Sequence, residues 1–249
     1  MDKLNLNEVT QFVENHIGDF HQRRIDKLNN IKLKEVLLHK NPYLFKAKNV
    51  NTAQDIVKGI LDAFLSSSEE GIFGNWLERL AIYINDQVYR GRKAGIEGVD
   101  LDFDKDGKRY LISIKSGPHW GNASQVKKMI SEFETARKRL STSGNKSSII
   151  CVNGCSYGRS NENNEYKSNG NYYKICGQRF WELISNDPEL YIKIIQPLSH
   201  EAEKRNKEFE HLYNQLINRL TKEFLNDFCL DDGSINWVKL VGFNSGQSQ

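Results

Sequence analysis

The chain has 249 residues, of which 38% are hydrophobic and 27% charged, and its net charge at pH 7 is +3. This composition is ordinary for a globular protein with one sizeable core, and no stretch approaches the roughly 18 consecutive apolar residues of a membrane-spanning helix. The first residues also lack the apolar stretch of a secretory signal, so we expect a cytoplasmic protein that contacts no membrane.

The N-terminal part of the chain predicts helices. Residues 5–40 are typical of two or three helices with much polar surface. Residues 52–65 predict another, which Thr52 can cap with Asp55 in the capping-box position. Serines and glutamates at 66–70 then predict a break in the helix.

A second, more apolar helix is expected at 72–88. Its apolar residues cover most of its circumference, so it belongs inside a domain. Glu78 lies in the middle of it, and small, amide and apolar residues are its neighbours at helical spacing. A carboxylate in such surroundings needs a partner.

The pattern then changes to the period of two that is typical of strands. Residues 98–103 and 108–115 predict two strands, and the Asp-Gly sequence within 104–107 predicts a hairpin turn between them. Because this turn makes the strands antiparallel, it can bring Asp100 close to Lys115 at the open end of the hairpin.

The rest of the chain predicts an α/β arrangement. A strand is expected at 147–152, and its continuous apolar run indicates a central place in the sheet. The remaining predicted elements are a helix at 124–140, a polar loop at 153–171, a strand at 172–176, a helix from 177 and a long amphipathic helix at 201–228.

An acid on one strand and a lysine at the end of the next is the arrangement of the PD-(D/E)XK nucleases. Cleavage of a phosphodiester needs a divalent metal on carboxylate oxygens, an activated water and positive charge near the phosphate. Asp100 is the predicted metal ligand, with the backbone carbonyl of Ile114 as a further one. Lys115 would orient or deprotonate the water, or neutralise developing charge.

The sequence departs from this motif at one position. Ser113 stands where an acidic residue usually precedes the lysine by two residues. A carboxylate from a nearby helix can fill the gap, and the alternatives are Glu78, Glu132 and Glu134. We favour Glu78, because a solvated helix face explains the other two equally well.

Five segments resemble the PmeII-like family of type II restriction endonucleases, over about residues 40 to 185. They are KNPYLFKAK (40–48), SEEGIFGNWLE (68–78), EGVDLDF (97–103), IKSGPHWGN (114–122) and CGQRFW (176–181). The resemblance implies a homodimer that cuts a short, near-palindromic site in double-stranded DNA with Mg²⁺ and leaves 5′-phosphates. It implies a cognate DNA methyltransferase that protects the host. Asp100 and Lys115 match the motif's acid and lysine.

The fold expected on this basis is α/β, with a PD-(D/E)XK restriction-endonuclease-like core, a mixed sheet flanked by helices, and additional N- and C-terminal helices. We expect a helical recognition or dimerisation region at 1–66 and the nuclease core at 67–198. The long helix and tail at 199–249 would pack on the core or on the dimer partner, and closing the core of its own subunit is the commoner outcome for such an apolar stripe.

Residues able to contact DNA follow the catalytic strand. Between 104 and 146 there are ten Lys or Arg against four Asp or Glu, which suits a polyanionic partner. Paired donors and acceptors read base edges, and lysines contact phosphates. The predicted DNA-contacting residues are Ser116, His119, Trp120, Asn122, Ser124, Gln125, Lys127 and Lys128.

Other interpretations stay open at this point. Cys151, Cys155 and Cys176 could hold zinc, although buried thiols in strands explain them more simply. The chain could be a repair or recombination nuclease of the same fold, or a non-catalytic DNA-binding module with a degenerate site, for which Ser113 is the main argument. A helix-rich interaction protein would leave Lys115 and the loop after it unexplained.

Overall fold

The computed structural model describes residues 2–142, 148–161 and 165–247. The helices are α1 (Leu6–Asn29), α2 (Leu33–Leu38), α3 (Pro42–Ala47), α4 (Ala53–Tyr89), α5 (Ala123–Thr142), α6 (Gln178–Ser185), α7 (Leu190–Lys193), α8 (Ile195–Leu198), α9 (Ala202–Phe228) and α10 (Trp237–Ser245). The strands are β1 (Leu101–Lys105), β2 (Lys108–Lys115), β3 (Ser148–Cys155), β4 (Tyr166–Lys167) and β5 (Tyr172–Cys176). None of the described helices is both long and apolar enough to cross a membrane.

The described chain forms two compact units. The first holds residues 1–17 and 73–200, and the second holds residues 18–72 and 201–249. The predicted α/β class, with a mixed sheet and additional helices towards both termini, is confirmed. The roles predicted for residues 1–66, 67–198 and 199–249 stay predictions.

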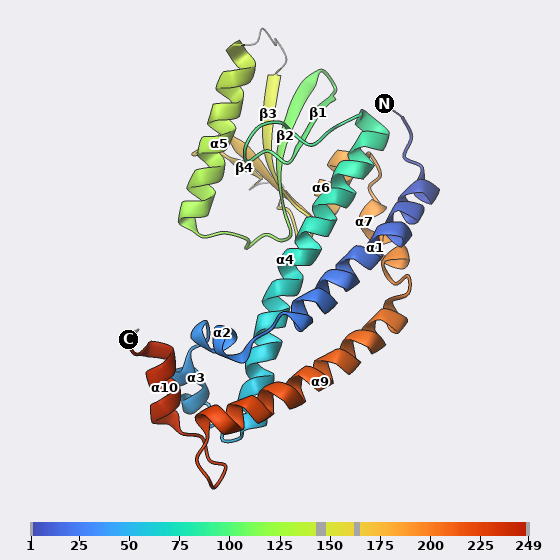
Figure 1. Ribbon diagram of the computed structural model, residues 1–249. Coiled ribbons are helices and arrows are strands. Elements are labelled where there is room, and N and C mark those ends of the chain that lie inside the picture. The colour runs from blue at the N-terminus through green and yellow to red at the C-terminus, as the bar shows by residue number, and fades with distance from the viewer. Residues whose placement is uncertain (1, 143–147, 162–164, 248–249) are drawn as a thin grey trace. The chain divides into compact units, whose positions relative to one another are not determined.

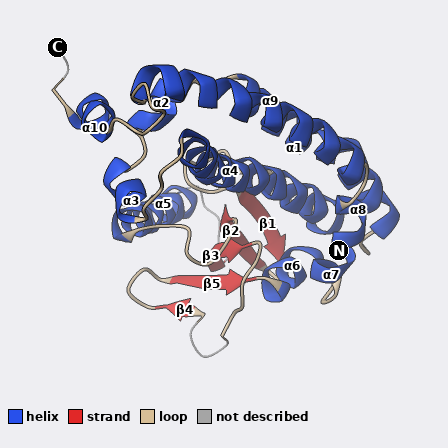
Figure 2. Ribbon diagram, turned by 90° about the horizontal axis from the view of Figure 1, so that it is seen from below, coloured by secondary structure: helices blue, strands red, loops and turns tan. Residues whose placement is uncertain are grey.

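The first unit contains the sheet, in which the described strands have the order β1-β2-β3-β5-β4 (Figure 2). The pair β1–β2 is antiparallel, whereas β2–β3 and β3–β5 are parallel. Asp106 and Gly107 both have positive φ, at 50° and 70°, as the predicted Asp-Gly hairpin turn requires. The predicted central position of β3 is also confirmed.

Helices cover the sheet of this unit on both faces. Helix α5 lies along one face (Figure 1), where Phe133 and Met129 pack in a buried cluster with Leu111 and Cys151 of the sheet. On the other face the Phe180 ring of α6 lies so close to Gly154 that a Cβ there would be 2.5 Å from it. The buried sheet holds β2 rigid, and Lys115 is its last residue.

The second unit is a helical assembly with a core of its own. Apolar side chains of α1, α2, α4, α9 and α10 form one buried cluster. The apolar stripe predicted on the long C-terminal helix belongs to this cluster, with Phe209, Leu216 and Leu220 buried. The stripe therefore closes the core of its own unit.

Two predicted boundaries are wrong. The break at 66–70 does not exist, because α4 runs without interruption for 37 residues. Serine and glutamate cost a helix interior only a few tenths of a kcal/mol each, which burial of the flanking apolar residues outweighs. The loop predicted at 153–171 begins too early, since β3 continues to Cys155 and β4 occupies Tyr166–Lys167. The predicted strand at 147–152 and the predicted loop at 153–171 include residues 147 and 162–164, which lie outside the described residues.

Candidate active site

Asp100 and Lys115 meet at the open end of the β1–β2 hairpin. The backbone N–H of Asp100 donates to the carbonyl of Ile112 at 2.8 Å, which extends the ladder one residue beyond β1. This register places the Asp100 carboxylate 3.8 Å from Nζ of Lys115, both side chains being only partly exposed, at 22% and 28%. The same carboxylate oxygen, Oδ2, accepts a 2.7 Å hydrogen bond from the backbone N–H of Ile114.

The environment of Asp100 disfavours its ionised form. Burial raises the pKa of its carboxyl, and the negative charge of Glu78 raises it further. The Lys115 ammonium and the Ile114 N–H act in the opposite direction, but burial is the larger effect. A buried carboxylate with a raised pKa gains from a nearby cation, which is the electrostatic character of a metal ligand.

Glu78 on α4 is near enough to Asp100 for its charge to raise the pKa of the Asp100 carboxyl. Gly74 of α4 packs against Ser116, the residue that follows β2. A Cβ on this glycine would be 3.4 Å from the serine Cβ, so α4 lies next to the end of β2. The Glu78 carboxylate is 21% exposed and pairs with Nζ of Lys93 at 3.2 Å. The expected partner of Glu78 is therefore Lys93, which the sequence analysis missed because it lies in an irregular segment outside α4 and the strands.

The two other carboxylates considered for this role lie on α5. Glu132 pairs with Lys128 at 3.6 Å and fills the space beside Gly98, whose φ is +76°. A Cβ at Gly98 would lie 2.0 Å from the Glu132 carboxylate, so the absence of a side chain there is necessary. Glu134 is exposed. Only Glu78 of these three contributes to the raised pKa of Asp100.

Ser113 is buried, at 1% exposure, and lies beside Asn153 of β3. The side-chain amide of Asn153 donates to the Ser113 carbonyl at 3.4 Å. The motif position that is usually acidic thus contributes no carboxylate.

The segment after Lys115 is held by defined contacts. Nζ of Lys115 lies 5.1 Å from the centre of the Trp120 ring, and the indole Nε1–H of Trp120 donates to Oδ1 of Asn153 at 3.0 Å. Tyr157 packs on Gly117, and its backbone N–H donates to the Ser116 carbonyl at 3.0 Å. Sequence reasoning missed Asn153 and Tyr157, because Asn-Gly and Tyr-Gly pairs are typical of loops.

Several predicted DNA-contacting residues form the start of α5. The Asn122 side chain accepts hydrogen bonds from the Gln125 N–H at 3.0 Å and from the Ser124 hydroxyl at 2.7 Å. The Gln125 side chain accepts in return from the Asn122 N–H at 2.9 Å, which completes a reciprocal cap. His119 and Lys127 are exposed. These residues line the start of the helix next to the candidate site.

Comparison with known families places the chain in a nuclease family. The model of the family described as type II restriction endonuclease EcoO109I matches residues 7–206, which is most of the chain. The chain belongs to this family. Membership in the EcoO109I family implies a DNA endonuclease that depends on a metal. No curated protein matches the chain.

The donor set fits the metal that the EcoO109I family implies. Within the described ranges, no group of three or more His, Cys, Asp or Glu side chains is placed to hold a metal ion. Mg²⁺ does not need such a group, because it commonly binds through one or two carboxylates and keeps several waters. Asp100 and Glu78 supply two carboxylates, each neutralised by a lysine, Lys115 and Lys93 respectively.

The cysteines fit the interpretation as buried thiols. Cys151, Cys155 and Cys176 are buried, and none of the three forms a disulfide. Cys155 of β3 lies opposite Cys176 of β5 in the register of the two strands. Burial raises the pKa of Cys151 to about 11 and that of Cys155 to about 12. Burial in an apolar strand raises a thiol pKa in this way, so these values agree with the simpler interpretation as buried thiols.

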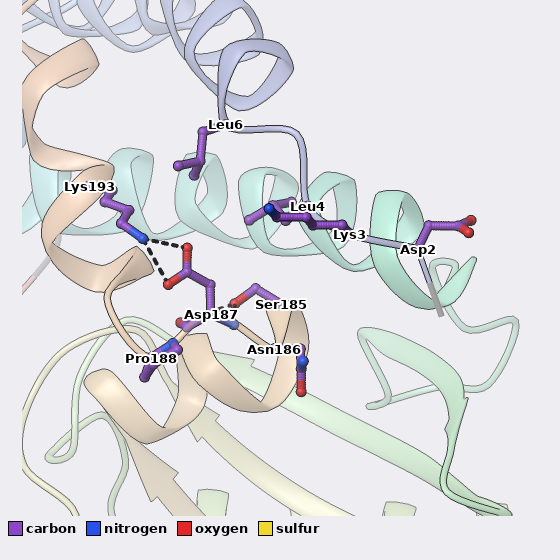
Figure 3. Close-up of a pocket in the computed structure, with 9 residues that line it drawn as sticks. All are labelled: Asp2, Lys3, Leu4, Leu6, Ser185, Asn186, Asp187, Pro188 and Lys193. Carbon is purple, nitrogen blue, oxygen red and sulfur yellow. Dashed lines mark hydrogen bonds and ion pairs between the residues drawn. The ribbon is translucent and has the colours of Figure 1, made fainter.

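The first unit also contains a cleft of about 500 Å³, whose lining residues are drawn in Figure 3. The N-terminal segment and the turn after α6 line it, and Lys193 pairs there with Asp187 at 2.8 Å. None of the predicted site residues lines this cleft.

Proposed function

We propose that the chain is a type II restriction endonuclease that cuts double-stranded DNA at a specific, short, near-palindromic site. The reaction is Mg²⁺-dependent phosphodiester hydrolysis that leaves 5′-phosphates. The observation that carries this proposal is the placement of Asp100 3.8 Å from Lys115, beside Glu78, in a chain of the EcoO109I family. The PmeII-like resemblance stays a prediction, because the family model that matches is that of EcoO109I.

Each residue of the site has a proposed role. Asp100 and Glu78 hold Mg²⁺, with the backbone carbonyl of Ile114 as a further ligand. Bound Mg²⁺ supplies charge to neutralise the phosphate and to acidify a water. Lys115 orients or deprotonates that water, or stabilises the charge that develops on the phosphate. Ser113 supports the strand from its buried position rather than contacting the metal.

DNA is proposed to lie across the loop after β2 and the start of α5. Ser116, His119, Asn122, Ser124 and Gln125 would face base edges or sugars, and Lys127 and Lys128 would face phosphates. A near-palindromic site has two-fold symmetry, so the proposed enzyme is a homodimer that presents one such surface to each half-site. The proposed biological partner is a DNA methyltransferase that protects the host's own sites.

Replacing Glu78 by glutamine is expected to lower the cutting rate by about two orders of magnitude or more, since a carboxylate ligand is lost without a change in shape. The Mg²⁺ concentration needed for half-maximal cutting should rise as well. The measurement is the single-turnover rate across a Mg²⁺ titration. Glu134→Gln, on the exposed face of α5, is the matched control and should behave as wild type. If instead Glu132→Gln were inactive and Glu78→Gln active, the second ligand would be Glu132.

The specificity is tested by sequencing the ends of fragments from a long plasmid or phage DNA. We expect every end to share one short, near-palindromic sequence and to carry a 5′-phosphate. Ends without a common sequence would overturn the restriction-type proposal in favour of a repair-type nuclease. DNA that is shifted in mobility but intact would favour a binding module.

A further inference from the structure

Trp120, Asn153 and Ser113 form a chain of contacts next to Lys115. None of the catalytic roles proposed above involves this chain of contacts. The Trp120 ring stands 5.1 Å from the Lys115 ammonium, and its Nε1–H donates to Oδ1 of Asn153 at 3.0 Å. The other end of the same amide, Nδ2, donates to the carbonyl of Ser113 at 3.4 Å. Asn153 thus connects the ring over the lysine to the strand that carries the lysine.

The burial of Asn153 requires an explanation. Its side chain is 1% exposed in the middle of β3, where its neighbour Val152 is apolar. An amide in such a place costs free energy unless it is hydrogen-bonded, and an apolar residue would avoid the cost. Both hydrogen bonds of the amide are directed at the Lys115 side of the sheet. The contacts therefore fix one particular orientation of Trp120 relative to β2.

That orientation matters because lysine is long and flexible. A lysine side chain loses rotamer entropy when it is held in one place. An aromatic face attracts an ammonium and limits the positions open to it. Nζ of Lys115 has both such neighbours, the centre of the Trp120 ring at 5.1 Å and the Asp100 carboxylate at 3.8 Å.

We propose that Asn153 and Trp120 are positioning residues: Asn153 orients the indole, and the indole holds the Lys115 ammonium beside Asp100 before DNA binds. The catalytic consequence of this positioning rests on the proposed function. This positioning role differs from the expectation that Trp120 contacts DNA, because the ring face is here turned to the lysine.

The first test measures the lysine itself and needs no cutting activity. The whole protein is treated with a limiting amine-acylating reagent, and the labelling of Lys115 is measured by mass spectrometry relative to exposed Lys108. Trp120→Ala and Asn153→Leu are each expected to raise the relative labelling of Lys115 about two- to fivefold, the range that loss of an exposed cation–π contact gives. Trp181→Phe is the matched control, since it removes another indole hydrogen bond, to the Ser156 carbonyl at 2.8 Å, in the same unit.

The second test measures catalysis. Trp120→Phe keeps an aromatic face but loses the bond to Asn153, and we expect it and Asn153→Leu each to lower kcat about tenfold with little change in KM. Trp120→Phe and Asn153→Leu both remove the hydrogen bond between these two residues. The variant that combines the two substitutions should therefore have a kcat no lower than that of the slower single variant. Unchanged labelling of Lys115, additive losses, or an effect on KM alone would overturn the proposal. If the variants raise the labelling of Lys115 but the wild-type protein cuts no DNA, the contact is supported, while the proposed function and its catalytic consequence are overturned.

Discussion

Replacing Lys115 by alanine is expected to abolish DNA cutting, with a loss of at least about a thousandfold in the single-turnover rate. The ammonium lies 3.8 Å from Asp100, and nothing else in the described contacts of Asp100 places a cation as close. Binding of DNA without Mg²⁺ should stay nearly intact, because one lysine contributes little to a surface with many phosphate contacts. The rate and the binding are measured on the same duplex.

The control for this variant is Lys108→Ala at the other, exposed end of β2. It removes the same charge from the same strand and should cut at the wild-type rate. Full activity of Lys115→Ala would remove this lysine from the active site. An equal loss in both variants would assign the effect to the charge of the strand rather than to the site.

Replacing Asp100 by asparagine is expected to remove activity and at the same time to stabilise the fold at neutral pH. The amide resembles the protonated acid, so it keeps the shape of the side chain but cannot serve as a charged metal ligand. Because burial raises the pKa of the Asp100 carboxyl above its ordinary value of 3.8, ionisation costs folding free energy. The cost is absent at pH below the unfolded pKa and fully present above the folded pKa.

The stability advantage of Asp100→Asn should therefore grow as the pH rises through that window and stay constant above it. Thermal unfolding without divalent metal, from pH 3 to pH 8, measures it. Asp104→Asn, at an exposed position of the same strand, is the control and should show no such pH-dependent gain. A variant that is less stable than wild type at pH 8 would contradict the electrostatic description of the site.

The sequence predicts the β1–β2 hairpin because the determinants of this hairpin are local. The Asp106–Gly107 turn fixes the register, and the register alone brings Asp100 opposite the strand end with Lys115. The sequence also shows that Glu78 needs a partner. It does not show that the partner is Lys93, because the path of the irregular segment after α4 depends on tertiary packing.

Other features depend on contacts far apart in the chain, and local patterns misplace them. Asn153 and Gly154 are typical turn residues, yet both are buried in β3. Gly154 is there because the Phe180 ring occupies the space of a side chain, and Asn153 because it binds Trp120. Residues 66–70 have the composition of a helix break, but α4 continues through them. In each case tertiary packing overrides a weak local preference.

The most direct test of the central claim is the dependence of DNA cutting on Mg²⁺. The purified protein is incubated with a long phage or plasmid DNA in Mg²⁺ and, in parallel, in EDTA, and the products are separated on a gel. Discrete fragments that form only with Mg²⁺ are the predicted result for a site built on Asp100, Glu78 and Lys115. DNA that stays intact in Mg²⁺, or that is cut equally well in EDTA, would contradict it.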